Sequence, residues 1–227
     1  SNINISYEQQ QIKGNRFYDF EDYFSEFDFS NNSALKNWPT HDISNLKAAL
    51  LASDLTIKHI EENEVSDLNN FLSRSLESMA SFNKKAHRFE MIEDEDGVLH
   101  INDSKATNFS ATVKSIESSS KLNKEGDIYL LCGGDFKSQS IDKVKATIFN
   151  DIKKCFIFGK DKKILEELLS DFTNCICCEN LDDAYFLAKQ ESINGDIILL
   201  SPACASIDMF KDYQDRGNRF KELMKLN

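Results

Sequence analysis

Short apolar runs alternate with helix-length segments through the second half of this 227-residue chain. The segments between the runs, such as residues 162–170 and 182–189, carry the spacing of amphipathic helices. Strands that alternate with helix-length crossovers are typical of βαβ units, which build a mostly parallel sheet with flanking helices. We therefore expect a Rossmann-like α/β domain. Its strands should lie at residues 97–101, 127–131, 154–158, 174–178 and 196–200.

The first half of the chain lacks this alternation. Residues 12–29 are dense in aromatic side chains with acids between them, which favours antiparallel strands that share one face. Asp42 is placed to cap a first helix, and Ser66 a second one. The apolar face of the second helix should consist of Leu68, Phe71, Leu72 and Leu76.

A small, polar stretch at residues 78–85 predicts a domain boundary, with one domain at residues 1–85 and the other at residues 86–227. The net charge of −11 argues against nucleic acid as a partner, because phosphate backbones need a Lys/Arg-rich surface. No apolar run approaches the roughly 18 residues of a membrane span, and no signal peptide is evident. We expect a cytoplasmic monomer, and the start at Ser1 rather than Met indicates a fragment of a longer protein.

The six cysteines all lie in the second half, mostly in or beside apolar runs. Cys175 and Cys178 form a C-x-x-C pair, but a zinc or redox site would need a second ligand pair or a thioredoxin-like context. Free cysteine in apolar runs behaves as a small hydrophobic residue. We therefore expect reduced core thiols and assign no metal ligand.

The turn at residues 102–108 holds the most informative polar residues. It joins the end of a predicted strand to the start of a predicted helix, which is where α/β sheets place their ligands. Asp103, Lys105 and Thr107 supply an acceptor, a cation and a hydroxyl at alternate positions. This set suits an anionic, hydroxyl-bearing ligand, while an ordinary capping loop with a solvated Lys105 remains the alternative.

A Gly-Gly pair follows the second of these strands. The surrounding segment superficially resembles a phosphate-binding loop, but the glycines that a P-loop requires are absent. The better interpretation is a turn at Gly133 and Gly134 that brings Lys137 over the sheet edge. A plain left-handed turn with a solvated lysine stays open.

Other candidates are weaker when taken singly. Ser206 ends a turn of small residues, and an amphipathic helix expected at residues 207–220 would add backbone N–H groups that can hold an anion. Ser206 as a nucleophile lacks the G-x-S-x-G elbow. Arg88 fits either a phosphate or ribose contact or a surface ion pair. Asn45 fits either an adenine contact or a surface amide.

Several of these segments together resemble, in order, the signatures of the Mur ligases that add D-glutamate. The matching segments are residues 40–45, 87–90, 102–108, 133–137 and 201–218. One departure is Asp42, where that family usually has Asn. Ligases that add other amino acids differ after the strand that ends at Ile101. The chain is therefore similar to the D-glutamate-adding branch of the Mur ligase family.

The resemblance implies a reaction in peptidoglycan precursor synthesis. ATP, with Mg²⁺, phosphorylates the carboxylate of UDP-N-acetylmuramoyl-L-alanine and leaves as ADP, and the amine of D-glutamate attacks the acyl phosphate. Residues 1–85 would be an α+β remnant of the central ATP-binding domain, and residues 86–227 the C-terminal Rossmann-like, amino-acid-binding domain. The P-loop and the magnesium ligands have no counterpart here, so we expect the isolated chain to be inactive.

The resemblance also implies residue roles on the nucleotide side. Asn45 would contact adenine, and Arg88 and Asp103 the rest of the nucleotide. Lys105, near the phosphates and the reacting centre, would be the catalytic residue.

On the amino-acid side, the resemblance implies that Thr107 and Lys137 hold the α-carboxylate of D-glutamate. Ser206 with Ile207, and the backbone around Tyr213, would hold its side-chain carboxylate. The family often has Phe where Tyr213 stands. Two alternatives stay open, a stand-alone α/β binding module for a small dianion and a non-catalytic regulator. A P-loop upstream in the same reading frame would favour the ligase.

Overall fold

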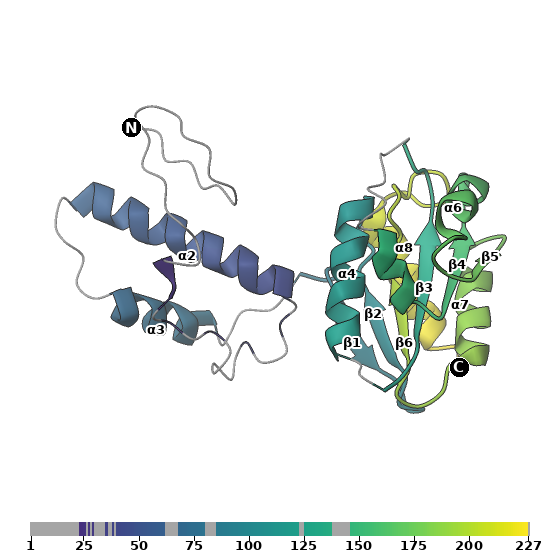
Figure 1. Ribbon diagram of the computed structural model, residues 1–227, viewed down its shortest axis with the longest axis horizontal. Helices are drawn as coiled ribbons and strands as arrows, with labels where there is room; N and C mark the ends of the chain where they lie inside the picture. The colour runs from purple at the N-terminus through teal and green to yellow at the C-terminus, as the bar shows by residue number, and fades with distance from the viewer. Residues whose placement is uncertain are drawn as a thin grey trace. The chain divides into compact units, whose positions relative to one another are not determined.

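The computed structural model describes residues 23–25, 27, 29, 35, 38, 40–61, 68–79, 85–122, 125–137 and 146–226 (Figure 1). The chain divides into two compact units, residues 1–83 and 84–227. This division falls two residues before the boundary expected between residues 85 and 86. The two units are described separately below.

The first unit is built on two helices, α2 (Thr40–Glu61) and α3 (Leu68–Met79). Leu72 and Leu76 of α3 are buried and share a core with leucines of α2. Asp42 lies in the first turn of α2 and does not cap it, because the helix already begins at Thr40. The carboxylate still favours the helix start, where the macrodipole is positive. Ser66 lies outside the described residues.

The aromatic segment at residues 12–29 was expected to form antiparallel strands, and this is wrong for its described residues. Tyr23, Phe24 and Phe29 lie in turns or single helical positions, not in strands. The rings of Phe24 and Phe29 meet edge to face, with centroids 5.4 Å apart, and both side chains are buried with the leucines of α2. Burial against a helix explains the aromatic density without a sheet. The rest of the segment lies outside the described residues.

The second unit contains a six-stranded sheet with strand order β1-β2-β6-β3-β4-β5 (Figure 1). Its strands are β1 (Glu90–Glu93), β2 (Leu99–Asn102), β3 (Ile128–Gly133), β4 (Lys154–Phe158), β5 (Cys175–Cys177) and β6 (Ile197–Leu200). From β2 to β5 all neighbours pair in parallel. The expected strands and the mostly parallel sheet are thus confirmed.

The antiparallel edge strand β1 was not foreseen. It pairs with β2 through a tight turn in which the Asp94 carboxylate accepts hydrogen bonds from the backbone N–H groups of Asp96 and Val98. Gly97 closes the turn with φ of 75°, a conformation that glycine adopts without strain. The strand is short and its side chains alternate between half-buried and exposed, so its apolar signal is weak.

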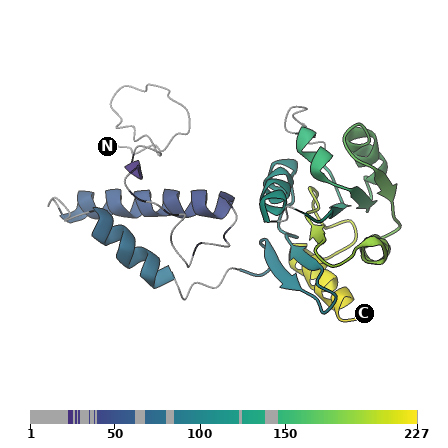
Figure 2. The ribbon, with the colours of Figure 1, turned by 60° about the horizontal axis from the view of Figure 1, so that its bottom comes forward.

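Helices cover both faces of the sheet (Figure 2). On one face lie α4 (Phe109–Leu122), the 3-10 helix η2 (Thr147–Asp151) and α6 (Lys162–Leu169). On the other face lie α7 (Leu181–Glu191) and α8 (Tyr213–Met224). Side chains alternate along the strands, so the sheet contributes to two separate hydrophobic cores. None of the described helices is long and apolar enough to cross a membrane.

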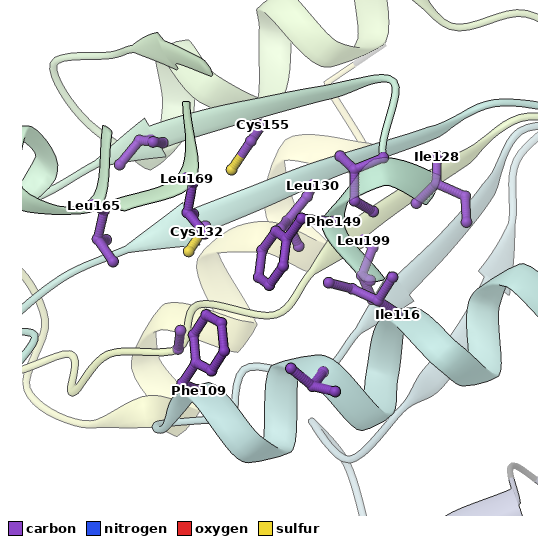
Figure 3. Close-up of a cluster of buried hydrophobic side chains, with 14 of the residues drawn as sticks. Phe109, Ile116, Ile128, Leu130, Cys132, Phe149, Cys155, Leu165, Leu169 and Leu199 are labelled. Atoms are coloured by element: carbon purple, nitrogen blue, oxygen red, sulfur yellow. The ribbon is translucent and has the colours of Figure 1, made fainter. Parts of the chain in front are cut away.

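The core under α4, η2 and α6 contains three buried cysteines, of which Figure 3 labels two. Cys132 of β3 and Cys155 of β4 are fully buried there, beside Leu165, Leu169 and Phe149. All six cysteines are free thiols. Four of them are buried, as expected for core thiols, namely Cys132, Cys155, Cys178 and Cys204.

The helix expected at residues 207–220 begins later, and the prediction is wrong for residues 207–212. Asp212 caps α8, since its side chain accepts a hydrogen bond of 2.8 Å from the backbone N–H of Asp215. Before that cap the chain turns back on itself, with the Ser206 carbonyl accepting from the N–H groups of Met209 and Phe210. The apolar residues in this turn are spaced as on one face of a helix, which is why the sequence predicted a helix here.

A buried histidine makes the stability of the second unit depend on pH. His100 of β2 is fully buried, with Nε2 3.2 Å from the Tyr185 hydroxyl and Nδ1 3.3 Å from the Val98 carbonyl. Burial lowers the pKa of His100 from 6.5 to about 4, although Asp94 opposes the shift. Between pH 6.5 and about 4, His100 is protonated in the unfolded chain but remains neutral in the folded chain.

We therefore expect the free energy of unfolding to fall as the pH drops from about 6.5 to about 4, by up to roughly 3 kcal/mol from His100. Urea unfolding at a series of pH values measures this slope. His100→Gln should have a shallower slope. Some slope should remain, because burial also lowers the pKa of His87. Equal slopes in parent and variant would contradict the assignment to His100.

Candidate functional site

The candidate turns lie at one edge of the sheet in the second unit. Because β2, β6, β3 and β4 are parallel neighbours, their carboxyl ends meet there. The turns that follow them are residues 103–108, 201–206, 134–137 and 159–161. These four turns therefore share one edge of the sheet, and it is the edge where open α/β sheets bind ligands.

Arg216 of α8 forms hydrogen bonds with three of these turns and so holds them together. Its side chain is fully buried, and Nη2 donates to the carbonyls of Ser104, at 2.9 Å, and Cys204, at 3.1 Å. Nη1 donates to the Cys204 carbonyl at 3.2 Å and reaches that of Gly133 at 3.5 Å. Nε donates to the Ser104 hydroxyl at 3.0 Å. Burial lowers the pKa of Arg216 to about 10, so the guanidinium remains charged at neutral pH.

Arg216 lies in a segment that matches the family, but its role was not evident from the sequence. Its position four residues before the buried Phe220, on the apolar face of the helix, could have indicated that Arg216 is buried. A charged residue in that place needs polar partners inside the protein. Here the partners are backbone carbonyls, and none of the described carboxylates forms an ion pair with it.

The turn after β3 requires its two glycines. Gly133 and Gly134 have φ of 139° and 131°. A Cβ atom on Gly134 would lie 2.2 Å from the Ala205 carbonyl oxygen. The close approach lets Asp135 exchange two backbone hydrogen bonds of 3.0 Å with Ala205. The exposed Lys137 is thus anchored beside the turn that carries Ser206.

Both carboxylate oxygens of Asp103 accept hydrogen bonds from other residues of the chain. One carboxylate oxygen accepts a hydrogen bond of 3.1 Å from the Phe89 backbone N–H, and the other accepts from the Ser115 hydroxyl of α4. The residue is only 9% exposed. Its clearest role is to hold the segment that contains Arg88 against the turn after β2, and this role was not foreseen. Lys105 and Thr107, farther along the turn, are half-buried.

Lys105 and Tyr213, assigned to different ligands by the resemblance, lie together. The Lys105 ammonium nitrogen is 4.1 Å from the centroid of the Tyr213 ring. The Tyr213 carbonyl accepts a hydrogen bond of 2.8 Å from the Ser104 hydroxyl. The start of α8 is therefore attached to the turn after β2.

The segment around Arg88 is held in an uncommon backbone conformation. His87 and Phe89 have φ of 64° and 48°. The His87 ring lies 3.0 Å from the Asn102 amide nitrogen, and the His87 N–H donates to Glu90. Strained backbone persists where its surroundings over-determine it. Arg88 is exposed between the two anchored residues.

The turn that contains Ser206 is also attached to the end of β4. Asp208 accepts a hydrogen bond of 2.9 Å from the Lys160 backbone N–H. Ser206 is buried, whereas the adjacent Ile207 is 64% exposed. Asn45 belongs to the other unit, where it is exposed on α2.

A surface hollow of about 530 Å³ lies elsewhere, beside the β1–β2 turn. Glu93, Asp94 and Asp96 line one part of it, and Lys189 and Lys221 another. Lys189 pairs with Asp94 and Asp96, so these charges largely satisfy one another. None of the candidate residues lines this hollow.

The fold and the carboxyl edge of the sheet together define the class of protein. It is a Rossmann-like α/β domain with cations, hydroxyls and backbone donors at the carboxyl ends of its strands. A family model described as "Mur ligase, glutamate ligase domain" matches residues 87–204. The chain belongs to the Mur ligase family.

Curated relatives agree with the family. A UDP-N-acetylmuramoylalanine--D-glutamate ligase of Hahella chejuensis is 39% identical over 150 residues, which are 66% of this chain and 33% of the relative. One of Buchnera aphidicola is 33% identical over 204 residues, which are 89% of this chain and 42% of the relative. The chain thus spans about a third to two fifths of the length of these relatives.

Solved structures support the fold. The UDP-N-acetylmuramate-alanine ligase MurC of Thermotoga maritima superposes with a TM-score of 0.53 at 14% identity, covering 83% of this chain and 38% of that one. The MurF ligase of the same organism, in complex with ADP, gives 0.52 at 16% identity and covers 83% and 39%. The expected Rossmann-like α/β fold is thereby confirmed.

Proposed function

We propose that this chain supplies the D-glutamate site, and part of the nucleotide site, of an ATP-dependent ligase that joins D-glutamate to UDP-N-acetylmuramoyl-L-alanine. The observation that carries the proposal is the fixed arrangement of three turns around Arg216, on a chain whose relatives carry that ligase name. A stand-alone binding module is not favoured, because the matching family model and the curated relatives are both of ligases.

The α-carboxylate of D-glutamate is assigned to Lys137 and Thr107. Lys137 offers an exposed cation on an anchored turn, and Thr107 offers a hydroxyl from the turn after β2. Hydrogen bonds that involve a charged group contribute about 1.5–3 kcal/mol each. Two such contacts from two turns can fix the orientation of a carboxylate.

The side-chain carboxylate is assigned to Ser206, the backbone of Ile207 and the start of α8 at Tyr213. The first N–H groups of an α-helix have no partner within the helix and point towards its N-terminal end, where the macrodipole attracts an anion. The Ser206 turn is held by Ala205 on one side and Asp208 on the other. A preformed turn of this kind loses little entropy when it binds a ligand.

The nucleotide phosphates are assigned to Lys105 and Arg88 of the second unit. Lys105 would stabilise the negative charge that develops when the amine of D-glutamate attacks the acyl phosphate and phosphate leaves. The described residues contain no group of three or more His, Cys, Asp or Glu side chains that could hold a metal ion. No Mg²⁺ ligand is assigned to the described residues.

The proposal predicts that the isolated chain binds D-glutamate weakly, with a dissociation constant on the order of millimolar, about −4 kcal/mol. Replacing Lys137 with Ala should weaken binding tenfold or more, because one charge-assisted contact of about 1.5–3 kcal/mol is lost. Chemical-shift titration of the isotope-labelled chain measures both. D-glutamate should bind more tightly than L-glutamate or D-aspartate, because both carboxylates are held.

Lys153→Ala is the matched control. It removes the same charge from a lysine that is exposed at the opposite end of β4, paired with Asp127. It should titrate like the parent. Equal responses to the three amino acids, or a Lys137→Ala variant that also matches the parent, would mean that the site lies elsewhere.

A further inference from the structure

We propose that the ring of Tyr213 is a positioning residue for Lys105, which it holds at the sheet edge with its charge intact. The inference rests on the proposed function, because it concerns the lysine assigned to the phosphates. The Lys105 nitrogen lies 4.1 Å from the ring centroid, well within the roughly 6 Å of a cation–π contact. Such a contact orients an ammonium group without neutralising it.

The ring is fixed in place. Its own carbonyl accepts a hydrogen bond from the Ser104 hydroxyl, which in turn accepts one from Nε of the buried Arg216. The His87 ring lies beside it in a T-shaped arrangement, with centroids 6.4 Å apart and an interplanar angle of 80°. Asp212 caps the helix directly before it. The Tyr213 ring is therefore a preformed platform for the lysine.

The lysine backbone is fixed as well. Its N–H donates to the His87 carbonyl at 3.1 Å, and its carbonyl accepts from the Thr107 N–H at 2.8 Å. Only the four-carbon side chain is left to move, and the Tyr213 ring contacts the ammonium group at its end. Both partners of the contact thus start from anchored positions.

The acids nearest along the chain all have other partners. Asp103 accepts from Phe89 and Ser115, Asp212 from the Asp215 N–H, and Asp215 from the Lys211 N–H. Glu90 pairs with Lys221. Among the described residues no carboxylate forms an ion pair with Lys105. In a chain with a net charge of −11 this matters, because a paired lysine would have to give up its partner before it could bind a phosphate.

The phenol hydroxyl plays no part in this contact, so phenylalanine should replace tyrosine without loss. The test compares the 227-residue chain with its Tyr213→Phe and Tyr213→Leu variants. The first readout is the NMR shift of the Lys105 ε-methylene, assigned with Lys105→Arg. The parent and Tyr213→Phe should show the upfield displacement caused by an aromatic ring, and Tyr213→Leu should not.

The second readout is titration with inorganic phosphate. Tyr213→Leu should bind roughly two- to fivefold more weakly than the parent, from the size of a cation–π contact at a partly exposed position. Phe186→Leu, which removes an exposed aromatic side chain from α7, should change neither readout. Amide spectra and thermal unfolding of each variant show whether it is folded.

The two readouts separate the two proposals. If the parent binds no phosphate while the ε-methylene shift depends on the ring, the nucleotide role of Lys105 fails and the positioning by Tyr213 stands. An upfield shift that survives in Tyr213→Leu overturns the positioning. So does a Tyr213→Leu variant that binds phosphate as tightly as the parent.

Discussion

Arg216→Met should lower the free energy of unfolding of the second unit by roughly 3 kcal/mol or more. The carbonyls of Ser104 and Cys204 would lose charged donors and remain buried, which costs about 1–3 kcal/mol for each unsatisfied group. A domain of ordinary stability, about 5–15 kcal/mol, would survive the loss. Chemical unfolding followed by far-UV circular dichroism measures it. Arg216→Lys should lie between parent and Arg216→Met, because a point charge cannot donate along the same fork.

Arg219→Met is the matched control, on the same helix. Arg219 is partly exposed and pairs with Asp182 and Glu222. Surface ion pairs contribute about 0–1 kcal/mol, so this variant should unfold nearly like the parent. If Arg216→Met were no less stable than Arg219→Met, the three turns would be held by something other than the guanidinium.

The parallel strands could be predicted because they are buried on both faces and therefore read as continuous apolar runs. β1 could not, since Glu90–Glu93 is an edge strand whose side chains are at most half-buried. The late start of α8 has a similar cause. Ile207, Met209 and Phe210 continue an apolar helical period, but Asp212 offers a cap, and the chain turns before it reaches that cap.

At the candidate edge, the sequence indicated which turns carry polar candidate residues but not what holds those turns together. The two glycines before Lys137 indicated a turn over the sheet edge, and the structure adds that the turn lies against the backbone of Ala205. Asp103 looked like a ligand contact, yet its hydrogen-bond partners are Phe89 and Ser115, which no local pattern relates to it. The role of Arg216 depends on backbone carbonyls from three distant turns. Carbonyl groups are present at every residue, so a sequence does not reveal which of them become acceptors.

Gly134→Ala should both destabilise the second unit and weaken D-glutamate binding. Alanine would be strained at φ of 131°, and its Cβ would lie 2.2 Å from the Ala205 carbonyl oxygen, which is backbone and cannot rotate away. Strain and overpacking each cost about 1–3 kcal/mol, so the loss in unfolding free energy should be roughly 2–5 kcal/mol. Relief of the clash would separate Asp135 from Ala205 and displace Lys137 from the Ser206 turn. Urea unfolding and D-glutamate titration measure the two effects.

Gly195→Ala separates the steric clash from the backbone strain. Gly195 also has a positive φ, of 91°, but a Cβ atom there would meet nothing within 4 Å, and the residue lies in the turn before β6, away from the carboxyl edge. This variant should lose only about 1 kcal/mol, the cost of a left-handed backbone for an L-residue, and should bind D-glutamate like the parent. If the two variants lost the same stability and the same affinity, the contact between the turns of Lys137 and Ser206 would contribute nothing to the site. A larger loss of both in Gly134→Ala would instead show that the amino-acid site depends on the registration of those two turns.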